Sequence, residues 1–121
     1  MSERSEKAVK NLKSFYSCSA SVMCAFADEI GISEEEAKTV AAPFAGGRMG
    51  KCGAVLAAEY ILSKKYGDRN ERITRFEKMF TDANRSVICR ELKGALTGSP
   101  LRSCRGCVTD AAEMLDIILS E

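Results

Sequence analysis

The sequence of 121 residues contains no histidine, and this absence excludes several kinds of functional site. It excludes serine–histidine and cysteine–histidine catalysis, zinc bound by imidazole and haem bound through a histidine ligand. The sequence also lacks a dinucleotide-binding fingerprint and paired carboxylates at a spacing typical of acid–base catalysis. A metal site in this chain would therefore be built mainly from the sulfur atoms of its six cysteines.

The sequence also lacks long apolar runs and a large excess of either basic or acidic residues. No run reaches the length of a membrane-spanning helix, so we expect no membrane insertion. The first seven residues are too charged for a signal peptide. Because 18 basic and 17 acidic residues are interleaved, we expect no nucleic-acid surface. We predict a cytoplasmic protein, where six cysteines indicate metal ligands or redox thiols and not permanent disulfides.

No segment alternates convincingly between apolar and polar residues, which disfavours β-strands. Apolar residues instead recur at helical spacing along most of the chain. We predict one all-α domain over residues 1–121, a compact bundle of about five to seven helices with a glycine-rich loop at the cysteine site. Gly31 is predicted to end the second helix, Ser33 and Glu36 to form a capping box for the third, and Asp68 to cap the fifth.

The stretch from Ala45 to Ala57 contains four of the nine glycines and leads into an apolar helix. Cys52 is predicted to lie in the first turn of this helix, where free N–H groups and the helix dipole favour a thiolate. The preceding glycines allow a positive φ and a close approach to a bound group. Ala45 and Cys52 stand where a phosphate loop needs glycine and a hydroxyl, which disfavours nucleotide binding. The stretch suits an anionic sulfur or a metal–sulfur centre, and equally an inert turn around a buried cysteine.

Four cysteines, Cys18, Cys52, Cys89 and Cys104, fall at or near predicted helix starts or short turns. They converge only if the helices pack around them, unlike the two loop-borne C-x-x-C knuckles of a zinc ribbon. The sequence has a single C-x-x-C, formed by Cys104 and Cys107, which by itself allows a redox pair. Cys24 shares a helix with large apolar residues and is predicted to be a buried core residue.

Several motifs, taken in order, resemble one known family. They are Cys18 with Ser-Ala-Ser-Val after it, the run from Gly46 to Val55, Cys89-Arg-Glu-Leu, and Cys104 with the run from Val108 to Glu113. The chain is thereby similar, from about Ala8 to Leu119, to the C-GCAxxG-C-C (CGAxxG) family, which is described as redox-active. The resemblance implies that the four family cysteines are Cys18, Cys52, Cys89 and Cys104.

The sequence departs from the family pattern in one place and has two cysteines besides the family set. Ala57 replaces the last glycine of the CGAxxG motif, although alanine still permits close helix packing. Cys24 and Cys107 match no family cysteine. The family itself is similar to a domain beside the haem domain of split-Soret cytochromes, for which an iron–sulfur cluster has been proposed.

Four cysteines without histidine suit an iron–sulfur cluster such as 2Fe–2S, and equally suit a structural zinc site. The glycine-rich loop favours the cluster, because backbone N–H groups can hydrogen-bond to its sulfurs. Arg48 and Lys51 suit the binding of an anionic substrate beside Cys52 or, as we favour, offset the negative charge of a thiolate or a cluster. A dithiol redox protein without metal stays open as an alternative. The predicted cofactor-binding residues are Cys18, Cys52, Cys89, Cys104, Gly47, Gly50 and Gly53.

The expected partner of an electron carrier is a redox protein, whose identity the sequence does not give. Surplus apolar residues on two peripheral-looking helices, around Phe15 and around Phe76 and Phe80, also predict a homodimer.

Overall fold

The computed structural model describes residues 2–95 and 98–121, and this part of the chain is helical. It contains no strand, only an isolated bridge between Lys51 and Ile88, so the prediction of an all-α fold is confirmed. The α-helices are α1 (Glu3–Lys13), α2 (Cys18–Ala25), α3 (Glu34–Ala41), α4 (Gly53–Tyr66), α5 (Glu71–Asn84), α6 (Cys89–Leu92) and α7 (Cys104–Leu119). Two 3-10 helices, η1 (Ala27–Ile30) and η2 (Ala42–Gly47), flank α3. Among the described residues, no helix is both long and apolar enough to cross a membrane.

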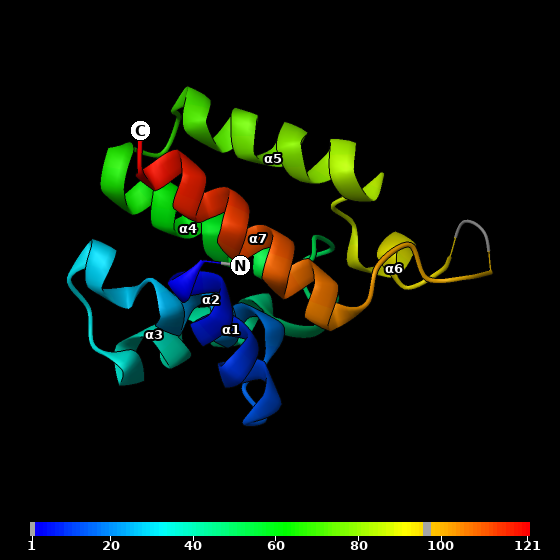
Figure 1. The fold of residues 1–121 in the computed structure, drawn as a ribbon, viewed down its shortest axis with the longest axis horizontal. Helices are drawn as coiled ribbons and strands as arrows, with labels where there is room; N and C mark the ends of the chain where they lie inside the picture. Colours follow the sequence, from blue (N-terminus) through cyan, green and yellow to red (C-terminus); the bar gives the residue numbers. More distant parts are fainter. Residues whose placement is uncertain (1, 96–97) are drawn as a thin grey trace.

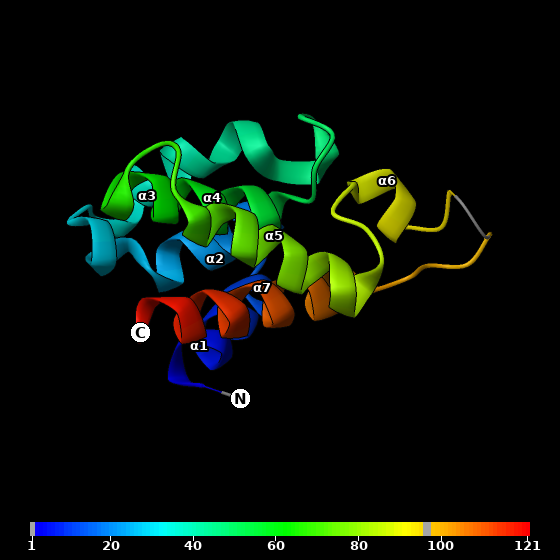
Figure 2. The same ribbon diagram turned by 90° about the horizontal axis from the view of Figure 1, so that it is seen from above.

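Helices α2, α4 and α7 form the centre of the molecule (Figures 1 and 2). The last helix, α7, packs against α1, α2, α4 and α5, and α2 packs against α1, α3 and α4. In both views the short helix α6 lies at the end of the molecule opposite the C-terminus. The start of α7 lies at this same end, and it brings a distant part of the chain towards α6.

Small residues allow α2 and α4 to pack closely. Ala54, Ala57 and Ala58 on α4 are fully buried, and Ala57 is the position where the family motif has glycine. Ser19 on α2 is also buried, and its hydroxyl donates to the carbonyl oxygen of Ala41 at 2.8 Å. Since this hydroxyl has a partner, the polar group costs little inside the core. Tight packing of small side chains thus fixes the two helices that carry Cys18 and Cys52.

The helix boundaries follow local signals, with two exceptions. Ser33 and Glu36 form the predicted capping box. The second helix, α2, ends at Ala25 and not at Gly31 as predicted; Gly31, with a φ of +67°, ends the 3-10 helix η1 that follows it. Asp68, however, does not cap α5, so that prediction was wrong. Asn70 takes the position, because its side-chain oxygen accepts hydrogen bonds from the N–H groups of Arg72 and Ile73 at 2.9 and 3.3 Å.

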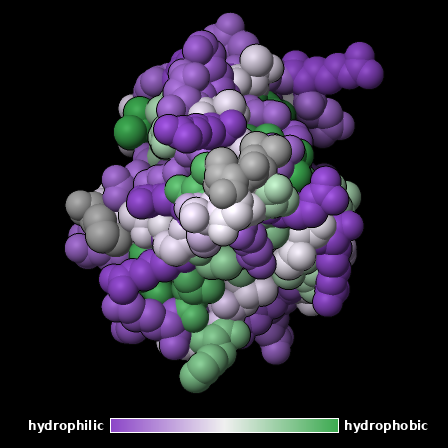
Figure 3. Space-filling model, turned by 90° about the vertical axis from the view of Figure 1, so that its right-hand side faces the viewer, coloured by the Kyte–Doolittle hydropathy of each residue, from purple (hydrophilic) through white to green (hydrophobic). Residues whose placement is uncertain are grey.

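The apolar residues proposed as a partner surface are mostly inside the protein. Phe76 and Phe80 on α5 are fully buried and stack at a ring-centroid distance of 6.4 Å, so they leave no surplus surface. Phe15 is different, because it is 97% exposed. Figure 3 shows hydrophobic side chains at several separate places on the face at the right of Figure 1, with hydrophilic ones between them. The homodimer stays a prediction, without the support of Phe76 and Phe80.

Candidate thiol site

A short backbone bridge joins the glycine-rich loop to the segment before α6. The N–H of Cys52 donates to the carbonyl oxygen of Val87 at 2.7 Å, and the N–H of Cys89 donates to that of Gly50 at 3.0 Å. Lys51 and Ile88 face each other between these two bonds as an antiparallel pair. The bridge therefore ties the start of α4 to the start of α6, and it brings Cys52 and Cys89 close together.

Two of the predicted glycines allow the backbone to touch a cysteine. A Cβ at Gly47 would lie 2.9 Å from the Cβ of Cys89, and a Cβ at Gly53 would lie 2.6 Å from the Sγ of Cys18. Gly50 has no such neighbour within 4 Å, and its φ of +90° identifies it as a turn residue. Whether any of these glycines binds a cofactor stays a prediction. In the structure, Gly47 and Gly53 leave room for the side chains of Cys89 and Cys18, and Gly50 allows the turn.

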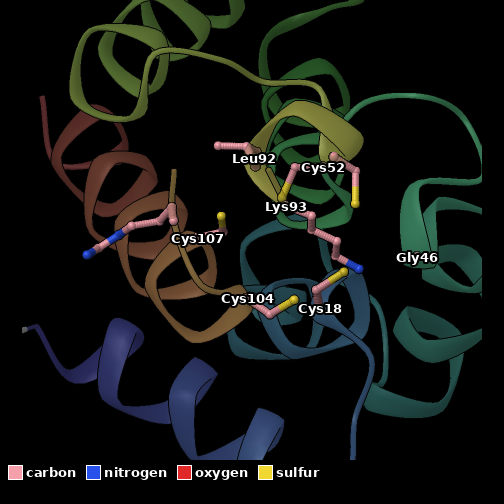
Figure 4. A pocket seen from close by; sticks show the side chains of 9 residues that line it. Cys18, Gly46, Cys52, Leu92, Lys93, Cys104 and Cys107 are labelled. Carbon is pink, nitrogen blue, oxygen red and sulfur yellow. The ribbon is translucent and has the colours of Figure 1, made fainter. Parts of the chain in front are cut away.

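All four family cysteines lie on the wall of one cavity of about 30 Å³, together with Cys107. Figure 4 shows side chains from α2, α4, α6 and α7 converging on this space. The complete wall consists of Cys18, Gly46, Cys52, Cys89, Leu92, Lys93, Arg102, Cys104 and Cys107. The packing of the helices thus brings together cysteines that are far apart in the sequence.

Cys107 is the site residue that the sequence analysis did not assign. Its spacing from Cys104 was the available signal, because residues three apart lie on one face of a helix. Both are in the first turns of α7 and face the cavity, with Cys107 buried and Cys104 exposed. Cys24 instead lies outside this cavity, where it is buried and its thiol donates to the carbonyl oxygen of Glu34 at 3.6 Å. The prediction of a core role for Cys24 is confirmed.

The thiol of Cys52 is set apart by its surroundings. Cys52 is the N-cap of α4 and precedes the first turn, in which it was predicted to lie. A hydrogen bond from the Cys107 thiol lowers the pKa of Cys52 to about 7, against the opposing effect of burial. The N–H groups of Val55 and Ala54 and the charge of Lys93 act in the same direction. The same hydrogen bond and burial raise the pKa of Cys107, so Cys52 is the acceptor and Cys107 the donor.

The cations at the cavity are not those that the sequence suggested. Lys93 and Arg102 line it, and the guanidinium of Arg102 pairs with both oxygens of Asp110 at 3.1 Å. Arg48 is exposed and does not line the cavity. The ammonium of Lys51 lies against two carboxylates, 3.2 Å from Glu59 and 3.0 Å from Glu77. Lys51 therefore pairs with these carboxylates, and Lys93 lies at the cavity, where Lys51 was expected.

The carboxyl group of Glu59 holds a proton more tightly than usual. Burial, followed by the neighbouring Glu77, raises the pKa of Glu59 to about 7. Its Oε2 atom is buried and has no hydrogen-bond partner among the described residues. A proton on Glu59 gives this carboxyl a hydrogen bond to donate to Glu77, whose own pKa is lowered. Near neutral pH the two carboxyl groups therefore hold one titrating proton between them, beside the ammonium of Lys51.

This proton makes stability depend on pH. In the unfolded chain Glu59 ionises near its ordinary pKa of 4.5, so the protonated folded form loses stability as pH rises from 4.5 to about 7. Glu59→Gln cannot ionise. We expect its stability advantage over the unmodified protein to grow by on the order of 1–2 kcal/mol between pH 5 and pH 8, because each pKa unit is worth about 1.4 kcal/mol and partial exposure screens some of it.

Urea unfolding of both proteins at the two pH values measures this difference. Glu77→Gln is the comparison variant: a lowered pKa contributes stability that is lost only as pH falls below the ordinary 4.5, so the direct contribution of Glu77 is nearly constant between pH 5 and pH 8. An advantage of Glu59→Gln that stays constant with pH would show that Glu59 does not hold the proton.

The donor set has the chemistry of a soft metal site, but the side chains are not arranged around a single ion. Within residues 2–95 and 98–121, no three histidine, cysteine or carboxylate residues are placed to hold a metal ion. Thiolates are the ligands of iron–sulfur clusters and of many zinc sites. The residues thus fit such a group in kind and number, while the cavity of about 30 Å³ has room for only about two water molecules.

The fold and the site together define a small helical protein with a cysteine-lined pocket. The family model described as "putative redox-active protein (C_GCAxxG_C_C)" matches residues 16–118, and the chain belongs to this family. No curated protein and no solved structure matches it.

Proposed function

We propose that this protein carries electrons on an iron–sulfur cluster bound by Cys18, Cys52, Cys89 and Cys104. The observation that supports the proposal is their position on one cavity wall, although they come from four separate segments of the chain. A 2Fe–2S cluster takes four thiolates, two on each iron. When bound, it would supply reversible one-electron chemistry, for which these residues provide no other group.

The surroundings of the four cysteines suit an anionic centre. Lys93 and Arg102 offer positive charge at the cavity wall, and the first turn of α4 presents backbone N–H groups beside Cys52. Leu92, which is buried, supplies an apolar wall. Because the cavity is smaller than a cluster, a loaded site has to be wider. Its exposed edge, which carries Cys104, is where the least packing would be disturbed.

Metal analysis of the anaerobically purified protein tests the proposal. We expect bound iron and inorganic sulfide, and replacement of any one of the four cysteines by serine should lower the iron content at least roughly tenfold, since each removes a ligand. Cys24→Ala is the matched control, because this cysteine is buried outside the cavity. It should retain the iron and lose only some stability.

Other contents of the site are outcomes of the same measurement. Zinc without iron would indicate a structural Cys₄ site, and neither metal with four free thiols would favour a dithiol redox protein. Either result would overturn the cluster. A redox partner protein and a cytoplasmic location remain predictions that accompany the proposal.

A further inference from the structure

The two segments that build most of the cavity wall carry an excess of basic residues. Residues 46–52 and 89–107 supply eight of the nine wall residues, and they contain six basic residues and one acidic residue. The rest of the chain contains twelve basic and sixteen acidic residues. The overall charge of +1 is therefore the sum of a positive part at the cysteines and a negative part elsewhere.

Most of these basic side chains have no carboxylate partner. Lys51 pairs with Glu59 and Glu77, and Arg102 pairs with Asp110. The other four are exposed and make no ion pair with any residue that the structure describes, and they are Arg48, Arg90, Lys93 and Arg105. Exposed cations around the cavity attract a negatively charged surface and speed its approach.

An exposed aromatic residue near these cations has an unfavourable backbone conformation. Phe15 is 97% exposed and has a φ of +71°, which residues other than glycine rarely adopt. It closes α1, since its N–H donates to the carbonyl oxygen of Leu12 and the N–H of Tyr16 donates to that of Asn11, both at 3.1 Å. Glycine is the usual residue at this position of a helix end. The fold gains nothing from a phenylalanine here, which points to a role at the surface.

Phe15 and Arg48 line one groove of about 390 Å³. The groove adjoins the cysteine cavity, because its wall includes Ser17, the neighbour in the chain of Cys18 on the cavity wall. Met49, which is 59% exposed, follows Arg48 in the glycine-rich loop. Figure 3 shows this side of the molecule, where separate hydrophobic side chains lie among hydrophilic ones. Phenylalanine, methionine and arginine are enriched in protein–protein interfaces.

We propose that this end of the molecule docks the acidic surface of a small electron-carrier protein, which the four exposed cations attract and Phe15 and Met49 contact. The identity of the partner as an electron carrier rests on the proposed function, whereas the docking itself requires no cluster. The partner would cover the cavity wall where Cys104 is exposed. A second copy of this chain is a poor occupant, because a two-fold contact would set the same cations against each other. Met49 favours a protein over a nucleic acid, whose partners use basic, polar and aromatic side chains.

Isothermal titration calorimetry of the anaerobically purified full-length protein tests the docking. The probes are a flavodoxin, which is a small acidic carrier, and a basic cytochrome c. We expect flavodoxin to bind at an ionic strength of about 10 mM, and its Kd to rise at least roughly tenfold at about 150 mM, where exposed charges are screened. Arg48→Glu should weaken this binding at least roughly tenfold, since it sets like charges against each other. Lys64→Glu, the same change of charge in the last turn of α4, should bind flavodoxin as the unmodified protein does.

Phe15→Gly separates docking from folding. Glycine suits the φ of +71°, so the melting temperature should not fall, while flavodoxin binding should weaken several-fold.

Several results would overturn the proposal, even if Phe15→Gly does not fold. They are the absence of flavodoxin binding at low ionic strength, binding of cytochrome c as tight as that of flavodoxin, and equal effects of Arg48→Glu and Lys64→Glu. Tighter binding of a single-stranded oligonucleotide than of flavodoxin would assign this end to nucleic acid instead. The iron content of the same sample is measured separately. A protein that lacks iron and still binds flavodoxin would refute the cluster and retain the docking surface.

Discussion

Phe76→Ala is expected to lower the free energy of unfolding by about 3–5 kcal/mol. Phe76 is fully buried and stacks with Phe80. Together the two rings are the buried apolar side chains that hold α5 in place. Truncation removes most of the side chain, and it leaves a cavity where α5 packs against α4 and α7. Small domains are stable by only about 5–15 kcal/mol, so this loss is a large part of the total. Chemical denaturation followed by far-UV circular dichroism measures it.

Ile117→Ala is the matched surface control, because Ile117 is 55% exposed on α7. Its effect should stay within about 0.5 kcal/mol. A loss for Phe76→Ala that is no greater than that of Ile117→Ala would mean that α5 is not held by its aromatic pair. The prediction in this way also tests the assignment of Phe76 and Phe80 to the core of the monomer.

The sequence predicted best what local chemistry decides. The capping box at Ser33 depends on residues three apart, and the helical periodicity on neighbours three and four apart. The family cysteines were recognisable because their flanking residues form a pattern along the chain. All of these signals are short in sequence. They gave the fold class and four of the cysteines of the candidate site without any knowledge of how the helices cross.

Long-range contacts account for the errors. The sequence does not reveal that Lys51 pairs with Glu77, 26 residues further on, and does not line the cavity. Nor does it reveal that Phe76 and Phe80 face α4 and α7 and not solvent. Cys107 became a site residue only because α7 returns to the start of α4. The helical spacing of apolar residues puts Cys107 on the apolar face of α7. Which residues contact that face is decided by how the helices pack.

Gly53→Ala is expected to disturb the cysteine site, although alanine is a better residue than glycine for forming the helix that begins at this position. Alanine is favoured over glycine in helices by up to about 1 kcal/mol. Against this, the new Cβ would lie 2.6 Å from the Sγ of Cys18 and 2.9 Å from the backbone oxygen of Phe44. The Cys18 side chain can rotate, but the carbonyl belongs to the backbone of η2 and has to shift. Such overpacking costs about 1–3 kcal/mol, so we expect net destabilisation and a displaced Cys18.

The displacement can be measured without any metal, as the rate at which N-ethylmaleimide alkylates Cys18. We expect this rate to rise several-fold in Gly53→Ala. Gly106→Ala is the matched control, since Gly106 is also a helical glycine in a first turn, that of α7. There the three atoms nearest to the Cβ all belong to the side chain of Arg102, which can swing away at the cost of its partly exposed ion pair with Asp110. Such a pair is worth about 0–1 kcal/mol, and the gain in helix propensity offsets it. Equal alkylation of Cys18 in both variants would show that the contact at Gly53 does not position this thiol.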